Sequence, residues 1–337
     1  MKVSDIGEFG LIDLLDKMAS AAEVKRTGAG QQLILGIGDD TAAWRGDTSV
    51  QLATVDSLIQ GIHFTLDIIS WQELGWRAMA ATLSDIAAMG GRPRYALVSL
   101  ALPGDTEVAD VTALYKGMIE LSRQFEVAII GGDTSQAPLV IINITVLGNT
   151  ESPHMLTRSA ARPGEKVAVT GHLGASAAGL EMLTKGIQFD AEAMAVLTRA
   201  FRQPYPRVAE GQILVGKDVR SAIDISDGLI ADLKHICQAS RVGARIEIDR
   251  VPVQPEVTAN FANRALELAL SGGEDYELLF TASTEVIEKV KKAVSCPVTV
   301  IGDITAENAG EIVLLDQNGN TVDQTSAGWE HFSRRTG

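Results

Sequence analysis

Apolar and polar residues recur along this chain with two periods, one typical of helices and one typical of strands. Helical spacing predicts helices over residues 9–18, 71–89, 107–124 and 228–240, with further helices between 175 and 215. Short apolar or alternating runs predict strands over residues 50–55, 95–102, 127–130, 139–147, 166–170, 221–223, 245–248, 278–281, 298–301 and 312–315. Because strands and helices alternate in both halves, the pattern predicts an α/β chain.

The length of the chain predicts two domains. Its 337 residues exceed the usual size of a single domain, while 46% hydrophobic and 21% charged residues are ordinary values for a globular protein. Residues 158–164 are basic, small and turn-forming, which makes this region the best candidate for the domain junction. We therefore expect an N-terminal domain over residues 1–153 and a C-terminal domain over residues 154–337.

Charge and cysteine content narrow the class of protein. A formal net charge of −14 argues against a nucleic-acid partner, because nucleic-acid affinity comes largely from Lys and Arg that neutralise phosphates. Cys237 and Cys296 show no zinc-type spacing with the five histidines, so we expect reduced thiols. The first residues lack the apolar core of a signal peptide, and no run of about 18 apolar residues follows. We expect a cytoplasmic protein with no membrane partner.

Carboxylates stand at widely separated positions, most of them where an apolar run ends in a turn. These acids are Asp39, Asp40, Asp56, Asp85, Asp133, Asp224 and Asp227. Since neighbouring residues of a strand point to opposite faces, we expect only one of the first two to face a given site. Hard oxygen ligands suit Mg²⁺, and phosphoryl transfer between polyanions needs such charge neutralisation. The acids therefore predict a site for several Mg²⁺ ions.

Each of these positions also has a plain structural interpretation. Residues 224–228 could form a helix N-cap in which Ser226 or Asp227 accepts backbone N–H groups. Residues 131–134 could be a simple turn that ends the preceding strand at its glycines. Asp85 is harder to explain in this way, because an acid on a nearly all-apolar helix is costly unless it is paired or bound to a metal.

Further candidates lie outside this set of acids. Residues 270–280 place a glycine pair and three acids before an apolar strand, which is costly without cations or polar ligand atoms nearby, although the segment could also be a solvated loop. Trp329 could anchor the C-terminal tail or offer a flat surface to a cationic aromatic ligand. Arg158 could bind a nucleotide phosphate or be a surface charge. His63 could reach the cleft of Asp56 or be structural, and packing is the plain role of Tyr115.

The usual nucleotide-binding motifs are incomplete. Residues 211–218 come within one residue of a P-loop, but Asp218 replaces the Ser or Thr that would reach Mg²⁺, and no strand leads into the first glycine. We interpret this segment as a coincidence on a helix. No Gly-x-Gly-x-x-Gly fingerprint occurs at a strand-to-helix turn either, so a nucleotide would have to bind through another architecture.

Six short motifs in register resemble bacterial thiamine-monophosphate kinases. They are Gly-Ile-Gly-Asp-Asp (36–40), Leu-Ser-Asp-Ile-Ala-Ala-Met-Gly (83–90), Gly-Gly-Asp-Thr (131–134), Leu-Thr-Arg-Ser (156–159), Asp-Ile-Ser-Asp-Gly-Leu (224–229) and Ser-Gly-Gly-Glu-Asp-Tyr-Glu-Leu (271–278). The likeness runs in order from Gly7 to Trp329, essentially the whole chain. That family belongs to a superfamily similar to aminoimidazole ribonucleotide synthetase, whose members bind ATP without a P-loop.

The resemblance implies a fold and a reaction. The fold is a two-domain PurM-like fold of the α/β (α+β) class, in which the N-terminal domain pairs with that of a second subunit to form a β-barrel. ATP and several Mg²⁺ ions would lie between this domain and the C-terminal α/β domain. The reaction would convert ATP and thiamine monophosphate to ADP and thiamine diphosphate, the last step of thiamine diphosphate biosynthesis. The transfer would be direct and in line, with no dedicated general base.

The resemblance also implies roles for individual residues. The positions that match Mg²⁺ ligands are Asp40, Thr54, Val55, Asp56, Asp85, Asp133, Asp224 and Asp227. Those that match nucleotide contacts are Tyr115, Gly132, Asp133, Arg158 and Ser226. Those that match contacts to thiamine monophosphate are His63, Glu274 and Trp329. Val55 stands where the family commonly has a hydroxyl residue, so only its carbonyl could bind a metal.

Two other functions remain open. The chain could be another ATP-using member of the superfamily, such as a selenophosphate, purine-pathway or hydrogenase-maturation enzyme. A selenium enzyme of that kind would offer a reactive Cys or selenocysteine near its N-terminus, and no cysteine precedes Cys237. The chain could also be a catalytically silent regulator that binds a nucleotide or metal, although acids spread over five segments argue against that function.

Overall fold

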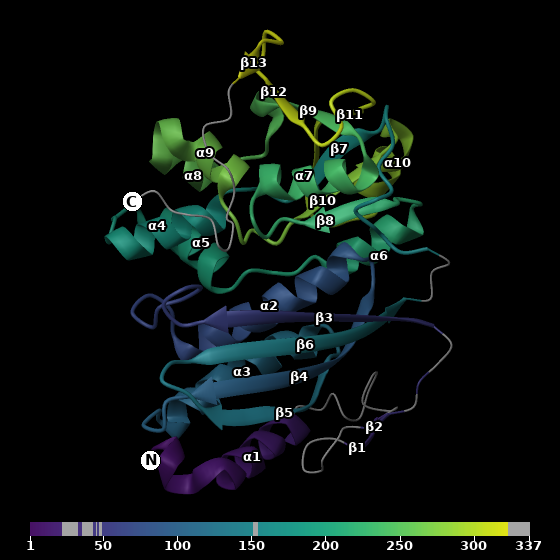
Figure 1. The fold of residues 1–337 in the computed structure, drawn as a ribbon. Coiled ribbons are helices and arrows are strands. Elements are labelled where there is room, and N and C mark those ends of the chain that lie inside the picture. The colour runs from purple at the N-terminus through teal and green to yellow at the C-terminus, as the bar shows by residue number, and fades with distance from the viewer. Residues whose placement is uncertain (22–32, 36–42, 45, 47–48, 151–153, 323–337) are drawn as a thin grey trace. The chain divides into compact units, whose positions relative to one another are not determined.

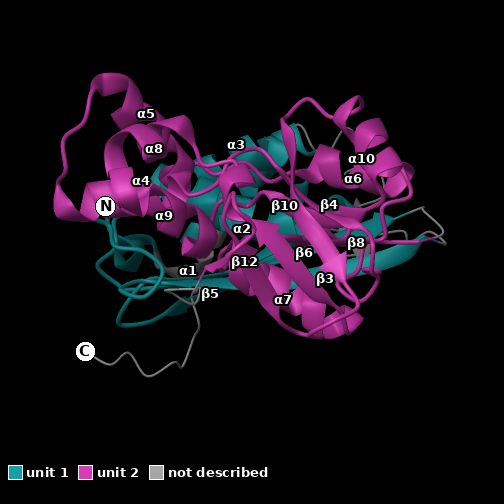
Figure 2. Cartoon of the chain, turned by 90° about the horizontal axis from the view of Figure 1, so that it is seen from above, with its two compact units in different colours: residues 1–86, 91–151 teal, residues 87–90, 152–337 magenta. Residues whose placement is uncertain are grey.

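The structure is a computed structural model that describes residues 1–21, 33–35, 43–44, 46, 49–150 and 154–322. The chain divides into two compact units, coloured separately in Figure 2. Unit 1 consists of Met1–Ile86 and Gly91–Glu151, and unit 2 consists of Ala87–Gly90 and Ser152–Gly337. Each unit contains helices and its own sheet with both parallel and antiparallel neighbours. The predicted two-domain α/β class is therefore confirmed.

Unit 1 is built on a four-stranded sheet with the order β3-β6-β4-β5. The elements of this part of the chain are α1 (Val3–Ala21), β1 (Leu33–Leu35), β2 (Ala43–Trp44), β3 (Val50–Ile59), α2 (Trp71–Ala88), β4 (Arg92–Leu102), α3 (Val108–Gln124), β5 (Ala128–Gln136) and β6 (Ile141–Thr150). Strand β6 runs antiparallel to β3 and β4, whereas β4 and β5 are parallel. Strands β1 and β2 form a separate antiparallel pair.

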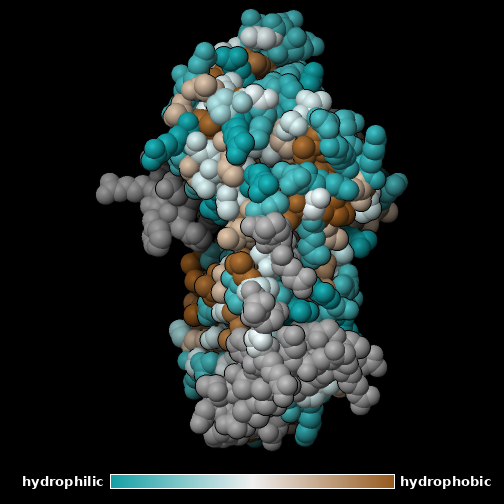
Figure 3. All heavy atoms as spheres, turned by 90° about the vertical axis from the view of Figure 1, so that its right-hand side faces the viewer, coloured by the Kyte–Doolittle hydropathy of each residue, from teal (hydrophilic) through white to brown (hydrophobic). Residues whose placement is uncertain are grey.

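Helices α2 and α3 cover one face of this sheet (Figure 1). The apolar pattern of residues 71–89 reflects this position, since α2 buries Leu74, Met79 and Leu83 completely. The opposite face of the sheet is less protected, because Val55 on β3 is 60% exposed. Hydrophobic surface is visible on one side of unit 1 in the space-filling view (Figure 3). One sheet face is thus a helix-covered core, and the other retains apolar side chains near solvent.

Strand β5 does not stop at Gly131, as the sequence predicted, but continues to Gln136. The pairing with β4 shifts by one residue between Ile129 and Gly131, which lets the strand pass an irregularity and remain in the sheet. Gly132 approaches β4 closely, since a Cβ there would lie 1.8 Å from the carbonyl oxygen of Val98. The glycine is therefore required by strand packing rather than by a turn.

Unit 2 is built on a seven-stranded sheet with the order β13-β12-β9-β11-β7-β10-β8. Its strands are β7 (Lys166–Thr170), β8 (Ser221–Asp224), β9 (Gly243–Glu247), β10 (Leu278–Ala282), β11 (Val298–Thr305), β12 (Ile312–Leu315) and β13 (Thr321–Val322). Its helices are α4 (Ala175–Lys185), α5 (Ala191–Arg202), α6 (Val208–Gly216), α7 (Leu229–Ser240), α8 (Pro255–Phe261), α9 (Ala265–Ser271), α10 (Thr284–Lys291) and the 3₁₀ helices η3 (Ile248–Arg250) and η4 (Ala262–Arg264).

The main core of unit 2 lies between this sheet and α7. Leu233 on α7, Ile223 on β8 and Leu279 on β10 are among its buried residues, each at most 2% exposed. The near match to a P-loop falls on α6, as predicted, and no strand enters it. Within the described residues, no helix has the length and apolar character needed to span a bilayer.

Candidate functional site

In unit 1, the structure brings Thr54 and Asp85 together although they are 31 positions apart. The Thr54 hydroxyl on β3 donates to Oδ2 of Asp85 on α2 at 2.5 Å. Asp85 is half-buried on a helix whose neighbouring residues are almost all buried. The predicted need of this acid for a polar partner is thus met by one of the other predicted ligand residues.

Successive side chains of β3 point to opposite faces of the sheet, so the predicted ligands on this strand are divided between the two faces. Thr54 and Asp56 are half-buried on the same face as the buried Leu52 and Leu58. Val55 points to the opposite face and is 60% exposed. Its side chain therefore does not share a face with the carboxylate of Asp56, which agrees with the inference that only its carbonyl could reach a metal.

Asp133 lies on the opposite edge of the same sheet. A direct row of cross-strand partners runs from Ser57 on β3 through Asn143 and Ser99 to Asp133 on β5. Three strand spacings separate the two edges by roughly 14 Å. Since Ser57 and Asp56 point to opposite faces, Asp133 also lies on the other face from Asp56. Within one copy of the chain, the sheet does not bring these two predicted ligands together.

Two further predicted residues of unit 1 have defined surroundings. His63 lies in the turn after β3, and its Nδ1 accepts a hydrogen bond from the N–H of Ile59 at 2.9 Å. In the neutral imidazole this leaves the proton on Nε2, which is then a donor. Tyr115 is only 4% exposed on α3, and burial raises the pKa of its phenol. In this structure its ring belongs to the buried side of α3, the plain role considered for it.

In unit 2, the predicted segments of residues 224–228 and 270–280 are hydrogen-bonded directly to each other. Asp224 ends β8, is 3% exposed and pairs with Leu278 of β10. Beyond the strands, the N–H of Glu274 donates to the carbonyl of Ser226 at 2.8 Å, and that of Tyr276 donates to the carbonyl of Ile225 at 2.9 Å. Backbone hydrogen bonds thus continue from the sheet into the loops that carry the predicted site residues.

Close packing of these two loops explains their glycines. A Cβ at Gly273 would lie 2.4 Å from the carbonyl oxygen of Ser226. Gly228 has a φ of 118°, which other residues rarely adopt, and it stands at the N-cap of α7. Neither Ser226 nor Asp227 occupies that cap position, so the N-cap interpretation of these two residues is wrong.

Asp232, which lies outside the predicted motifs, holds the N–H groups of the loop that leads into α7. Its Oδ2 accepts three consecutive backbone N–H groups, from Ser226 at 3.0 Å, Asp227 at 3.1 Å and Gly228 at 3.1 Å. The side chain is 1% exposed and lies in the first turn of α7. The signal that could have identified it is the one used for Asp85, an acid between apolar neighbours on a predicted helix.

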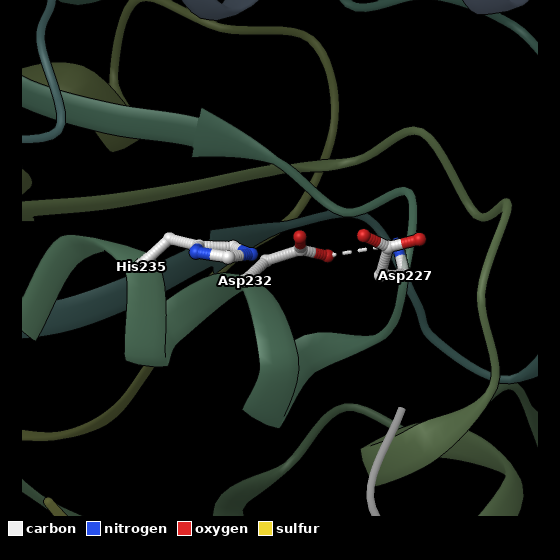
Figure 4. Close-up of side chains that lie close together, drawn as sticks. All are labelled: Asp227, Asp232 and His235. Carbon is white, nitrogen blue, oxygen red and sulfur yellow. Dashed lines mark hydrogen bonds between the residues drawn. The ribbon is translucent and has the colours of Figure 1, made fainter. Parts of the chain in front are cut away.

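The electrostatic environment of Asp232 is strongly acidic. Burial, followed by the nearby carboxylates of Asp224 and Asp227, raises the pKa of Asp232 to about 8, although the N–H groups oppose this effect. Ligand atoms of Asp227, Asp232 and His235 lie within 4.8 Å of one another. Figure 4 shows the Asp232 carboxylate between the Asp227 backbone and the His235 ring. This concentration of negative charge suits a cationic ligand.

The three acids of residues 274–277 have different surroundings. Asp275 accepts the N–H of Gly174 at 2.7 Å and that of Ser176 at 3.1 Å, and so holds the start of α4. Glu277 accepts two hydrogen bonds from Arg207, one from Nε to Oε2 at 2.7 Å and one from Nη2 to Oε1 at 2.5 Å. Two of the three acids therefore have polar partners within the protein itself, which offsets the cost of placing them at the strand edge without a cation. Glu274 is half-buried with a φ of 66°.

Arg158 lies on an exposed loop that α7 holds in place. Its carbonyl oxygen accepts the Ser240 hydroxyl at 2.7 Å, and the same hydroxyl oxygen accepts the N–H of Ala161 at 3.0 Å. Arg158 is an exposed residue, which suits a role in binding an anionic ligand. Asp39, Asp40 and Trp329 lie outside the described residues.

Known proteins resemble the chain over nearly its whole length. The family model for AIR synthase related protein, N-terminal domain, matches residues 38–150, and that for AIR synthase related protein, C-terminal domain, matches residues 162–314. A thiamine-monophosphate kinase from Bacillus subtilis (strain 168) is 36% identical over 308 residues, which covers 88% of this chain and 93% of the relative.

Solved structures agree with these matches. The thiamine-monophosphate kinase from Stenotrophomonas maltophilia K279a has a TM-score of 0.81 and 30% identity, and the likeness covers 91% of this chain and 96% of that chain. The structure described as AaThiL complexed with AMPPCP and TMP has a TM-score of 0.76 and 32% identity, and covers 98% of this chain and 99% of that chain. The chain therefore belongs to the thiamine-monophosphate kinase family of AIR synthase related proteins.

Proposed function

We propose that the chain is an enzyme that transfers the γ-phosphoryl group of ATP to thiamine monophosphate and releases ADP and thiamine diphosphate. The observation that carries this proposal is the match, over 98% of this chain at 32% identity, to a protein solved with AMPPCP and TMP. AMPPCP is an ATP analogue, and TMP is the acceptor that the name of the B. subtilis relative implies. ATP is therefore the co-substrate in this proposal.

The chemistry of the acceptor makes a general base unnecessary. A terminal phosphate oxygen of thiamine monophosphate is already ionised at neutral pH, so it can attack the γ-phosphorus directly and in line. What the protein must provide is positioning and neutralisation of charge between two anions. No side chain is assigned a proton-transfer role in this proposal.

The donor set of the described residues fits Mg²⁺. It consists of hard oxygen donors: the carboxylates of Asp56, Asp85, Asp133, Asp224 and Asp227, the Thr54 hydroxyl and the Val55 carbonyl. Asp40 would complete this set. When bound, Mg²⁺ would neutralise charge on the reacting phosphates. The buried position of Asp224, at 3% exposure, favours such a role because a buried carboxylate needs a counter-charge.

The remaining residues would bind the two substrates. We assign Tyr115, Gly132, Asp133, Arg158 and Ser226 to the nucleotide, and His63, Glu274 and Trp329 to thiamine monophosphate. Three observations support these roles: Arg158 is exposed, His63 uses Nδ1 to accept the N–H of Ile59, and Glu274 is held against the loop of Ser226 by a backbone hydrogen bond of 2.8 Å. Among the members of this set that the structure describes, Tyr115 is the most buried.

A homodimer is part of this proposal. In the described sheet of unit 1, β3 and β5 are edge strands, and edge strands invite pairing with another chain. Pairing through both edges would close the sheets of two copies into the barrel that the family resemblance implies. It would also bring β5 of one copy beside β3 of the other, which shortens the distance between the backbones of Asp133 and Asp56, although their side chains would still point to opposite faces of the barrel wall.

A coupled ADP-release assay tests the function. Purified protein with ATP and Mg²⁺ should release ADP with thiamine monophosphate, and should release none above background with free thiamine, aminoimidazole precursors or selenide. Thiamine diphosphate should form in equal amount, as measured by chromatography. Turnover with another acceptor but not with thiamine monophosphate would overturn the proposal, as would a complete lack of ADP release under all these conditions.

A further inference from the structure

The loop that carries Asp224 and Asp227 is held by an internal acceptor. Residues 226, 227 and 228 each direct a backbone N–H at the same oxygen, Oδ2 of Asp232, at 3.0 to 3.1 Å. Successive N–H groups that converge in this way form a concavity that binds an anion. Here the acceptor in that position is a side chain of the chain itself (Figure 4).

The start of α7 explains why an acceptor is needed at this point. The first N–H groups of a helix have no partner within the helix, and Gly228 at the N-cap has no side chain to supply one. A carboxylate at a helix N-terminus is also favoured by the positive end of the helix dipole. From inside the first turn, Asp232 accepts the N–H of the N-cap Gly228 and, before the helix, those of Ser226 and Asp227, while it is 1% exposed.

The same contacts argue against Oδ2 as a metal ligand. A carboxylate oxygen has two lone pairs, and three N–H donors already occupy this one. The closeness of Asp232 to Asp227 and His235 therefore does not by itself make it part of a cation site.

We propose that Asp232 is a positioning residue, which holds the loop of residues 225–228 so that the side chains of Asp224 and Asp227 keep the orientation needed to bind Mg²⁺. This inference rests on the proposed function. Hydrogen bonds from Glu274 and Tyr276 hold the carbonyl side of the same loop, while Asp232 holds its N–H side. The loop is thus held by hydrogen bonds on both its carbonyl side and its N–H side. A single oxygen of Asp232 accepts all three on the N–H side.

The test compares Asp232→Asn and Asp232→Ala with a matched control, Asp190→Ala. Asp190 is also a helix-capping acid of unit 2, because its side chain accepts the N–H of Ala193 at 2.9 Å at the start of α5. Like Asp232, it accepts a backbone N–H beside the start of a helix, but that hydrogen bond is at the start of α5 and not to the loop of residues 225–228. Asp232→Asn keeps the shape of the side chain and one acceptor oxygen, so it remains informative where Asp232→Ala does not fold.

Two measurements do not depend on turnover. In amide hydrogen exchange, the N–H groups of residues 226–228 should exchange faster in both Asp232 variants and at the wild-type rate in Asp190→Ala. In a Mn²⁺ titration followed by electron paramagnetic resonance, with ADP present, the Asp232 variants should bind Mn²⁺ about 10- to 100-fold more weakly, the loss typical when a supporting residue of a metal ligand is removed. Asp232→Asn should lie between the wild type and Asp232→Ala.

Kinetics separates positioning from general instability. The Mg²⁺ concentration for half-maximal activity should rise and kcat should fall in Asp232→Asn, with little change in KM for thiamine monophosphate. Unaltered exchange at residues 226–228, or wild-type Mn²⁺ affinity, in a folded Asp232 variant would overturn the inference. An equal loss of Mn²⁺ affinity in Asp190→Ala would do the same. If the wild type shows no kinase activity, the proposed function fails, whereas exchange still reports whether Asp232 holds the loop.

Discussion

At the scale of single residues, the acids of this chain differ in what satisfies them. Asp85 accepts a hydrogen bond from the hydroxyl of Thr54, another predicted ligand residue. Asp275 accepts a backbone N–H at the start of α4, and Glu277 accepts a hydrogen bond from Arg207. An acid with a structural partner has less capacity left for a ligand. The partner of each carboxylate therefore separates structural acids from candidate ligands better than the density of acids along the chain does.

The hydrogen bond between Thr54 and Asp85 leads to a prediction about metal binding. Thr54→Val removes the hydroxyl but keeps the branched shape, so Asp85 loses its donor at 2.5 Å without a change in packing volume. We expect the Mg²⁺ concentration for half-maximal activity to rise about 10-fold. The measurement is a Mg²⁺ titration of ADP release, with Thr54→Ser as the control that retains the hydroxyl. An unchanged Mg²⁺ requirement in the valine variant would contradict the prediction.

Asp275 leads to a prediction about pH. Burial, with further contributions from Glu277 and Glu274, raises the pKa of Asp275 to about 7 from its ordinary value of 3.8, against the N–H bonds of Gly174 and Ser176. Because the folded state disfavours the ionised form, the wild type loses stability as pH rises through the interval between these two values and no further above it.

The side chain of Asp275→Asn cannot ionise, so the stability of this variant does not fall for this reason as pH rises. The free energy of unfolding of the wild type, minus that of Asp275→Asn, should therefore decrease from pH 4.5 to pH 8. Urea denaturation of both proteins at several pH values measures this difference, and other titrating groups largely cancel in it. A difference that is constant or that increases with pH would show that the asparagine comparison does not report an elevated pKa.

At the scale of elements, the site residues are presented by the ends of strands and by the loops that continue their hydrogen bonding. Strand β8 delivers Asp224, and β10 begins where residues 272–277 end. The two loops exchange backbone hydrogen bonds as if the strands continued. Such loops are held more rigidly than surface turns, which suits a site that must hold two anions in line.

The contact between β4 and β5 can be tested by replacing its glycines. Gly132→Ala would place a Cβ 1.8 Å from the backbone oxygen of Val98, which cannot move without a shift of the strand. We expect a loss of about 1–3 kcal/mol in the free energy of unfolding. Gly131→Ala is the matched control, because its Cβ would meet only the Leu97 side chain at 3.1 Å. Equal losses in urea denaturation of the two variants would show that close strand packing is not the cause.

At the scale of the whole molecule, the proposed dimer depends on the unprotected face and edges of the unit 1 sheet. Val55 is 60% exposed on the edge strand β3. Val55→Glu would place a charge in the proposed barrel without disturbing the helix-covered core, because Val55 does not face that core. We expect this variant to be monomeric at concentrations where the wild type is dimeric.

Sedimentation equilibrium measures the outcome. Leu180→Glu is the control, since Leu180 is 39% exposed on α4 of unit 2 and lies outside the proposed interface. It should leave the dimer intact. A wild type that sediments as a monomer, or a Val55→Glu variant that remains dimeric, would contradict the proposed pairing.

Sequence patterns were sufficient for elements whose periodicity is long and regular. The helices predicted over 71–89, 107–124 and 228–240 agree with α2, α3 and α7 to within one residue at either end. Motifs in register were sufficient for the family, because several loops with the same acids in the same order rarely arise by chance. The predicted end of β5 was wrong. A glycine pair usually marks a turn, but here it allows two strands to pack closely.

What the sequence by itself determined is therefore the elements, the family and the residue types available for chemistry, because these depend on local spacing and composition. Tertiary structure alone decided which partner each acid has. It joined Thr54 to Asp85, placed Asp133 across the sheet from Asp56, and directed three N–H groups at Asp232. These relationships depend on strand order, register and burial, which bring together residues that no short stretch of sequence contains.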